Sequence, residues 1–287
     1  MKKQFLLFAA AASLIISCQT DEVNSEEATS EVEEIQTENL EITAKTISKI
    51  KSLSLNSDDI ETITTRFPDG KIETSYLVEG DISISKSQLE SMKIAKTNTK
   101  QYRTYNLVES PRVIEVTGYA GNGDPLNLTP KQLEALEAAI DNYNDLGIGL
   151  TFNLTITSDI PTLLSGDTYV FQNPNGQAGG VAGFPSAGNP FGTVQIFSGM
   201  EAFSLQVNTH VMTHELGHTV GLRHTDWFTR QSCGRPSFGE LANPSGAVHI
   251  PGTPYGFDPT SIMLSCFSTR VTGEFGPNDV VALNYLY

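Results

Sequence analysis

Three histidines and one glutamate lie close together in the segment HELGHTVGLRH. Residues four apart share one face of a helix, so His214 and His218 would point the same way with Glu215 beside them. Two imidazoles one turn apart form a chelating pair at the distance of about 2.0–2.1 Å that zinc requires. Gly221 would end the helix without steric cost, and the turn that follows would bring His224 back as a third ligand.

Three protein ligands are typical of a catalytic zinc site, because they leave one coordination position open for water. Glu215 could take a proton from that water and pass it to a leaving amine. The alternative is an ordinary amphipathic helix that happens to carry histidines. The pattern H-E-x-x-H-x-x-G-x-x-H fixes five positions, with a chance probability of about 10⁻⁵ in such a chain, which disfavours that alternative. We therefore predict Zn²⁺ bound by His214, His218 and His224, with Glu215 as general base.

The same segment, followed by SIM at Ser261–Met263, resembles the metzincin clan of zinc metalloendopeptidases. With RHTD, FDPTSIM and GPNDVVALNYLY in the same order, the chain is most similar to the bacterial dual-action HEIGH metallopeptidases from about Arg103 onward. This resemblance implies an α+β catalytic domain with a mixed twisted sheet, a backing helix and an active-site helix. It also implies cleavage of protein or peptide substrates, and it makes Met263 the residue of a methionine turn beneath the metal.

Some positions depart from these families or stay open. Ser265 stands where astacin-type enzymes carry a tyrosine that reaches the zinc. His249 and Tyr255 are candidates to replace it, although each also reads as an ordinary loop residue. His210 is on the ligand face of the helix and is read as a packed or supporting histidine. Asp226 could orient a ligand histidine or cap the following turn.

The stretch QAGGVAGFP precedes the histidine segment. Metzincins bind a peptide as an extra strand on an exposed sheet edge, and glycines there would allow close backbone approach. We predict substrate contacts at Gly180, Val181 and Ala182. The alternative is a mobile glycine-rich surface loop. A third hypothesis is a zinc hydrolase that acts on non-peptide bonds, and the predicted edge strand disfavours it.

A pro-like unit is predicted over residues 45–103, before the metallopeptidase domain at 104–287. It reads as two strands joined by a Pro-Asp-Gly turn and a short helix in SKSQLESMKIAK. LVEGDI resembles the F-x-G-D latch of astacin pro-segments, although Val78 replaces the aromatic residue. The resemblance implies that Asp81 occupies the open zinc position until cleavage near Arg103. The alternative is a Gly-Asp turn that ends a hairpin.

The metallopeptidase domain has clear element signals. RVIEVTGY, GLTFNLTIT, DTYVF and TVQIF read as strands. LTPKQLEALEAAIDNYNDLG reads as a helix with Thr129 as N-cap, Gln132 completing a capping box and Gly147 at the end. Its expected apolar face consists of Leu133, Leu136, Ala139, Ile140 and Tyr143. The order indicates a mixed sheet backed by helices.

The N-terminus has the layout of a secretory signal over residues 1–17. The ending IISC resembles a lipobox, so Cys18 is predicted to be lipidated; a plain signal peptide is the alternative. Residues 18–44 contain nine acidic residues and no basic one, which predicts a solvated tether. We expect an outer-membrane or cell-surface lipoprotein, or one facing the periplasm, that contacts the membrane through its lipid only.

The formal net charge of −15 argues against nucleic acid as a partner, because binding phosphates requires basic patches. Cys233 and Cys266 are expected to form a disulfide in an oxidising compartment, with two buried free thiols as the alternative. The sequence does not determine an oligomeric state. The runner-up function is a non-catalytic surface-binding lipoprotein that retains the fold.

Overall fold

The computed structural model describes most of the chain from Leu40 to the C-terminus. The described residues are 40–53, 55–92, 103–104, 106–121, 123–227, 229–234, 250–254 and 256–287. The signal sequence, Cys18, most of the tether, His249 and Tyr255 lie outside them. Within the described residues, no helix is both long and apolar enough to cross a membrane.

The N-terminal elements form a small antiparallel sheet with two helices. Their order is α1 (Ala44–Ser52), β1 (Glu61–Arg66), β2 (Ile72–Val78), β3 (Ile82–Ile84) and α2 (Lys86–Ser91). The sheet order is β1-β2-β3. The predicted Pro-Asp-Gly turn joins β1 to β2, where Gly70 adopts a φ of +85° that favours glycine. The sequence patterns predict β1, β2 and α2 but neither α1 nor β3.

A five-stranded mixed sheet forms the centre of the larger part, as predicted. Its strands are β4 (Arg112–Tyr119), β5 (Leu150–Thr157), β6 (Thr168–Asn173), β7 (Gly180–Val181) and β8 (Thr193–Phe197). The order is β5-β4-β6-β8-β7, and every pair is parallel except β7 with β8. The two-residue strand β7 is therefore one edge strand of this sheet, and β5 is the other.

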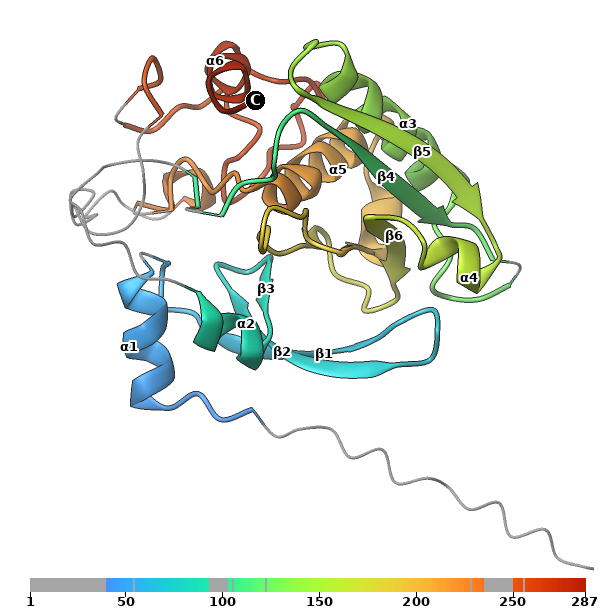
Figure 1. Cartoon of the computed structure of the whole chain (residues 1–287), viewed down its shortest axis with the longest axis horizontal. Coiled ribbons are helices and arrows are strands. Elements are labelled where there is room, and N and C mark those ends of the chain that lie inside the picture. Colours follow the sequence, from blue (N-terminus) through green and yellow to red (C-terminus); the bar gives the residue numbers. More distant parts are fainter. Residues whose placement is uncertain are drawn as a thin grey trace, which may run out of the picture. The chain divides into compact units, whose positions relative to one another are not determined.

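Two long helices, α3 (Pro130–Asn144) and α5 (Leu205–Val220), pack against the sheet and against each other (Figure 1). The predicted capping box of α3 is present between Thr129 and Gln132. Helix α5 begins after the N-cap Ser204, and all its residues from Val207 to Val220 are buried. Its position in the core explains why the histidine segment lacks a polar face.

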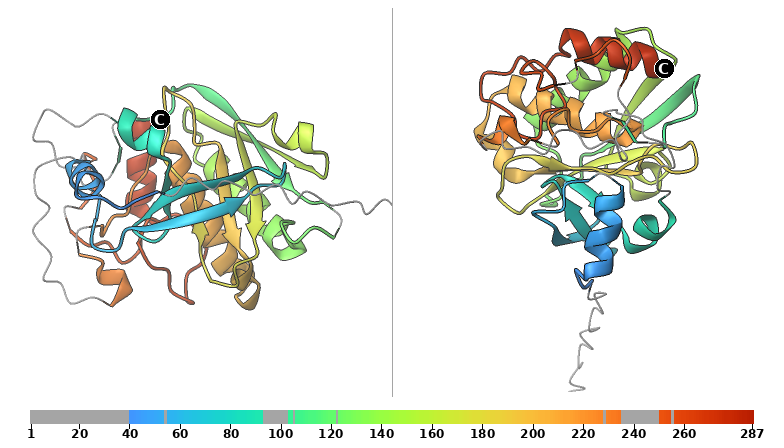
Figure 2. Two further views of the ribbon diagram at one scale, coloured as in Figure 1. Left: turned by 90° about the horizontal axis from the view of Figure 1, so that it is seen from below. Right: turned by 90° about the vertical axis from the view of Figure 1, so that its left-hand side faces the viewer.

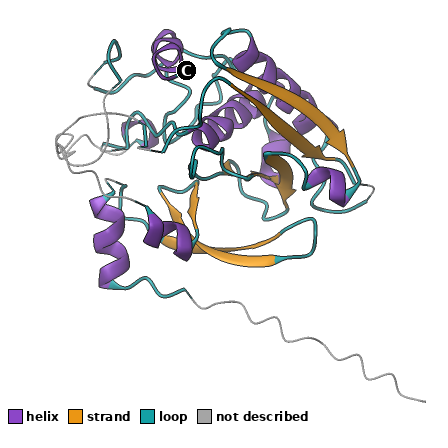
Figure 3. Ribbon diagram, viewed as in Figure 1, coloured by secondary structure: helices purple, strands orange, loops and turns teal. Residues whose placement is uncertain are grey.

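The remaining helical elements are short or lie at the chain end. They are α4 (Ile160–Leu163), α6 (Pro277–Leu286) and two 3₁₀ turns, Ser198–Ala202 and Gln231–Cys233. Figure 3 shows helices and strands mixed along the chain, which agrees with the expected α+β class.

The small sheet packs against the larger sheet, on the side away from α5 (Figure 2). Phe184, which follows β7, is part of the apolar core of the N-terminal elements. Phe67 contacts the rings of Tyr169 and Phe171 on β6, and the Thr65 hydroxyl donates to Gln195 on β8 over 3.2 Å. The N-terminal elements therefore share buried apolar and polar contacts with the larger sheet.

Candidate metal centre

The three predicted histidine ligands converge at the C-terminal half of α5. The Nε2 atom of His224 lies 3.2 Å from that of His214 and 3.3 Å from that of His218. A fourth group, the carboxylate of Asp81, enters from the turn between β2 and β3. Its Oδ2 atom lies 2.9 Å from Nε2 of His224, and one ligand atom from each of the four residues lies within 4.8 Å of the others.

Local backbone geometry explains how His224 reaches the other two histidines. Gly221 ends α5 with a φ of +107°, and a Cβ there would lie 2.8 Å from the carbonyl oxygen of Asn106. Only glycine therefore fits both the conformation and the space at this turn. The turn reverses the chain and returns it to the face that carries His214 and His218.

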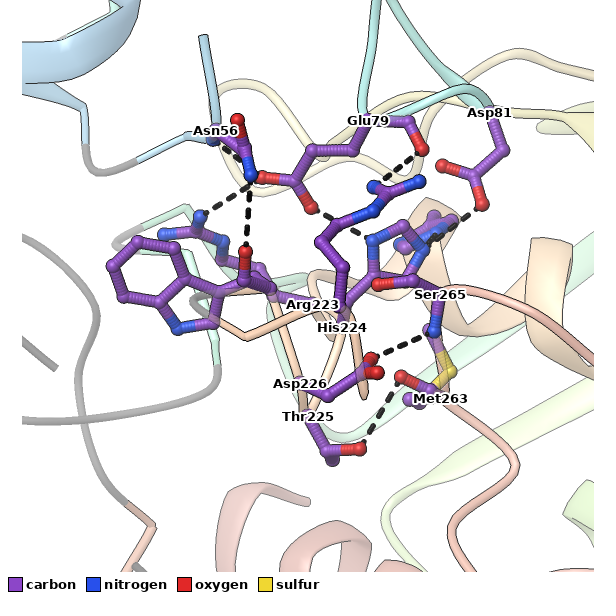
Figure 4. Close-up of polar contacts among 12 residues, drawn as sticks. Asn56, Glu79, Asp81, Arg223, His224, Thr225, Asp226, Met263 and Ser265 are labelled. Carbon is purple, nitrogen blue, oxygen red and sulfur yellow. Dashed lines mark hydrogen bonds and ion pairs between the residues drawn. The ribbon is translucent and has the colours of Figure 1, made fainter. Parts of the chain in front are cut away.

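Each of the three imidazoles is oriented by an acceptor at its Nδ1 atom. His214 faces the carbonyl oxygen of Ile262 at 2.8 Å, and His218 faces that of Leu222 at 2.9 Å. His224 faces the carboxylate of Glu79 at 2.7 Å (Figure 4). These acceptors carry no proton, so each Nδ1 donates, and a neutral ring then presents a lone pair at Nε2.

This donor set fits a tetrahedral metal ion. Ligand atoms at about 2.0–2.1 Å from zinc are separated from one another by about 3.3–3.4 Å in a tetrahedron. The two Nε2 separations of 3.2 and 3.3 Å match that spacing. Lone pairs at this distance repel one another unless a positive charge lies between them. The residues present are therefore suited to hold a dication.

The carboxylates of Asp81 and Glu79 favour a positive charge at the point where the histidine rings meet. Burial by itself would lower the pKa of His224, but the carboxylates of Asp81 and Glu79 outweigh it and raise that pKa to about 10. Burial disfavours ionisation of Asp81 too, yet the neighbouring histidines lower its pKa below the usual range. His218 has a pKa well below its usual value, chiefly because of burial.

Glu215 lies beside these groups and is also buried. Its pKa is raised, first by burial and then by the charge of Asp81. Among the described residues its Oε2 atom has no hydrogen-bond partner. It faces a cleft of about 400 Å³ whose lining includes His210, His214, Glu215, Gly180, Asp81 and Arg230. A carboxylate with a free oxygen next to a metal position is suited to proton transfer.

Met263 is buried beneath α5. A Cβ on Gly217 would lie 2.7 Å from its Sδ atom, so the glycine of HELGH provides the space for this contact. The preceding residue, Ile262, supplies the carbonyl that orients His214. Asp279 on α6 holds this turn, because its carboxylate accepts from the Ser261 hydroxyl and the Ile262 amide.

Two connections hold together the segments that follow His224 and Met263. The predicted disulfide between Cys233 and Cys266 is confirmed. The carboxylate of Asp226 accepts from the backbone amide of Ser232 at 2.9 Å. It also accepts from that of Ser265 at 2.9 Å (Figure 4). Asp226 therefore orients these loops, and within the described part of the chain it shares no hydrogen bond with a histidine ring.

The edge strand predicted to receive substrate is covered by the N-terminal elements. The amide of Ser83 donates to the carbonyl oxygen of Ala182 over 2.7 Å, and the amide of Ala182 donates to the carbonyl oxygen of Asp81 over 3.0 Å. The bridge between Ile82 and Ala182 is parallel. The turn that carries Asp81 thus pairs with the same edge that is formed by Gly180, Val181 and Ala182.

The sequence indicated that His210 lies near the predicted ligands, but it did not indicate a role for Glu79. His210 is buried in the cleft lining, and burial, then His214, lower its pKa to about 3. Glu79 was not predicted as a site residue, although it orients His224. The sequence feature that could have identified Glu79 is its position in LVEGDI, two residues before Asp81.

The chain is similar in sequence to one known protein family and in fold to several solved structures. A sequence model described as the dual-action HEIGH metallo-peptidase family matches residues 76–287. No curated protein matches the chain. Two solved structures of myroilysin align with TM-scores of 0.40 and 0.39 at 16% and 14% identity; they cover 63% and 64% of this chain and 82% and 86% of theirs. Metalloproteinase-II from Bacteroides fragilis aligns with a TM-score of 0.34 at 12% identity, over 80% of this chain and 76% of its own.

The matched range contains Asp81, all three converging histidines, Glu215 and Met263, and so includes every group of the site described above. The chain therefore belongs to the dual-action HEIGH metallopeptidases.

Proposed function

We propose that the protein is a zinc-dependent endopeptidase whose metal is held by His214, His218 and His224. The observation that carries this proposal is that Nε2 of His224 lies at tetrahedral ligand spacing from Nε2 of both His214 and His218, with each of the three rings oriented through Nδ1. When bound, zinc would supply a Lewis acid that polarises the scissile carbonyl and acidifies a bound water.

Glu215 is the proposed general base. Its free Oε2 atom accepts the proton of the attacking water, and the same oxygen then donates that proton to the nitrogen of the leaving amine. Its burial beside Gly180 keeps the carboxylate in one place and away from bulk water. The water oxygen bonds to the carbonyl carbon first, and the carbon–nitrogen bond breaks once the nitrogen has taken up the proton, which gives a carboxylic acid and an amine.

Gly180, Val181 and Ala182 are the proposed substrate contacts. They form the edge of the five-stranded sheet, where a peptide could add as a strand through main-chain hydrogen bonds. The absence of a side chain at Gly180 lets a backbone lie close to Glu215. A peptide bound here would run next to the predicted metal.

We further propose that the enzyme is latent in the arrangement described. The carboxylate of Asp81 lies where the fourth ligand of the metal would be, and residues Asp81–Ser83 occupy the substrate edge. A water and a peptide would each have to displace the same turn. Cleavage near Arg103 is the proposed release step; residues 93–102 lie outside the described part of the chain.

The proposed location follows from the N-terminal sequence. Residues 1–17 would direct export, Cys18 would carry the lipid, and the acidic stretch from residue 18 would separate the folded part from an outer-membrane or cell-surface attachment. Replacing Cys18 with serine should move the protein from the membrane fraction to the soluble fraction after cell fractionation.

A digest of casein or a peptide mixture tests the enzymatic proposal. The full-length protein is assayed intact and after limited trypsin treatment, with and without a chelator, and its zinc content is measured. Glu215→Ala, treated identically, is the control for residual trypsin. We expect zinc-containing, trypsin-activated, chelator-sensitive activity that Glu215→Ala lowers by about 10²–10⁴-fold. Equal cleavage by both trypsin-treated proteins, with no loss when the chelator is added, would favour the non-catalytic binding lipoprotein instead.

A further inference from the structure

The carboxylate of Glu79 connects the N-terminal elements directly to the third predicted ligand. Its Oε2 atom lies 2.7 Å from Nδ1 of His224, and both side chains have no exposed surface. Glu79 and Asp81 belong to the same turn, so one segment contacts both ring nitrogens of His224, with Glu79 at Nδ1 and Asp81 at Nε2. Figure 4 shows the imidazole between the two carboxylates.

The three histidines differ in where their orienting groups come from. His214 is oriented by Ile262 and His218 by Leu222, which both lie in the metallopeptidase part of the chain. His224 is oriented by Glu79, which lies in the N-terminal elements. Displacement of those elements would therefore leave two imidazoles supported and deprive the third of its acceptor.

The surroundings of Glu79 fit a specific docked position. Its Oε1 atom accepts from the amide of Asn56 over 2.8 Å and lies 3.6 Å from Nη2 of Arg223, whose side chain is almost fully buried. Its backbone carbonyl accepts from Nη1 of Arg230 over 2.8 Å. A buried carboxylate is stable only with such partners, and Arg223 and Arg230 are supplied by the metallopeptidase part.

The backbone of Glu79 also departs from what its residue type prefers. Its φ is +59°, in the left-handed region that favours glycine, and the cost for another residue is about 1–2 kcal/mol. A glycine would satisfy the turn better, so the turn itself does not require a glutamate. Strained residues of this kind concentrate at functional sites, where the side chain is needed.

We propose that Glu79 is a positioning residue through which docking of the N-terminal elements strengthens metal binding at His224. This inference rests on the proposed function, and it adds a second action to the latch. Asp81 would block the fourth metal position, whereas Glu79 would complete the orientation of a ligand. The latent form would then bind metal more tightly than a form with these elements displaced, and by reciprocity bound metal would hold the elements in place.

Metal affinity of full-length variants tests this role. Zinc dissociation constants are measured by competition with a chelating dye for the unaltered protein, Glu79→Gln and Glu90→Gln. Glu90 is an exposed glutamate on α2 and serves as the matched control. We expect zinc binding of Glu79→Gln to be about 10–100-fold weaker, as for other residues that orient metal-bound histidines, and that of Glu90→Gln to be unchanged.

The visible spectrum of the cobalt-substituted proteins separates orientation from general stability. We expect Glu79→Gln to shift or weaken the cobalt bands, because the ligand field at His224 changes. Glu90→Gln should keep the spectrum of the unaltered protein. Zinc affinity of Glu79→Gln within twofold of the unaltered value, together with an unchanged cobalt spectrum, would overturn the proposal.

A second variant guards against misfolding caused by removing the charge that faces the buried Arg223. In Glu79→Leu with Arg223→Met, both charges of the buried pair are replaced by apolar side chains, an exchange that is often tolerated. We expect the same loss of zinc affinity with a cooperative melting transition in the metal-free protein. Equal zinc affinity in all variants would overturn the proposed role of Glu79 but not the proposed function. Failure of the unaltered protein to take up any zinc overturns the proposed function as well.

Discussion

The Oδ2 atom of Asp81 lies 2.9 Å from Nε2 of His224, although the two residues are 143 positions apart in the chain. The same oxygen lies 3.5 Å from Nε2 of His214. A carboxylate from the turn after β2 therefore reaches the point on which the histidine ring nitrogens converge. This contact gives a direct test of latency.

Replacing Asp81 with alanine should increase the peptidase activity of the uncleaved full-length protein several-fold, because the fourth metal position then opens to water. The increase should stay below that of the trypsin-activated protein, since residues 82–83 still cover the substrate edge. Initial rates on a fluorogenic peptide measure this. Asp58→Ala, at an exposed position of the same elements, is the control. If Asp81→Ala is no more active than the unaltered full-length protein, the latch is wrong.

Gly180→Ala should impair catalysis while zinc is retained. A Cβ at this position would lie 2.8 Å from both Cγ and Oε1 of Glu215 and 2.9 Å from the carbonyl oxygen of Gln195, so the carboxylate must move. We expect kcat of the activated protein to fall at least about tenfold, a moderate part of what a positioned base contributes. Gly192→Ala is the control, because its Cβ would meet only one atom, at 4.0 Å. Full activity of Gly180→Ala would contradict the placement of Glu215.

Metal removal should lower thermal stability. A ligand present at 100 times its dissociation constant stabilises the folded state by about 2.7 kcal/mol, which corresponds to a Tm change of about 5–10 °C for a chain of this size. We expect the Tm to fall by this amount when a chelator is added, as measured by differential scanning calorimetry. The variant His214→Ala with His218→Ala should show no response to the chelator. An equal Tm with and without chelator in the unaltered protein would argue against a bound metal.

Asp279→Ala should destabilise the protein through the methionine turn. The Asp279 carboxylate accepts from the Ser261 hydroxyl and from the amides of Ile262 and Gly276, which would lose their partner. Three hydrogen bonds to a charged group at about 1.5–3 kcal/mol each would total about 5–9 kcal/mol, but the burial that raises the pKa of Asp279 offsets part of this. We therefore expect the free energy of unfolding to fall by about 2–5 kcal/mol in urea titrations.

Asp279→Asn provides the comparison for this effect. Its amide oxygen can still accept from the two backbone amides, and its NH₂ group can donate to the Ser261 hydroxyl. We expect a smaller loss of stability than with alanine. Equal losses in both variants would mean that shape rather than hydrogen bonding determines the contribution of Asp279.

The sequence predicted the features that depend on local geometry. His214, Glu215 and His218 share a helix, whose period places them together, and Gly221 allows the turn that returns His224. The capping box of α3 likewise lies within four residues of the chain. Such features depend on residue type and spacing over one or two turns, so they can be read without a structure.

Only the tertiary structure revealed the contacts between distant segments. Glu79 and His224 are 145 positions apart, and the edge strand at Ala182 pairs with Asp81 and Ser83. LVEGDI had indicated a carboxylate near the metal, but not that the preceding glutamate orients a ligand. Packing of the small sheet on the large one determines these contacts, because burial and register across about 100 residues or more are set by the whole fold and not by spacing in the sequence.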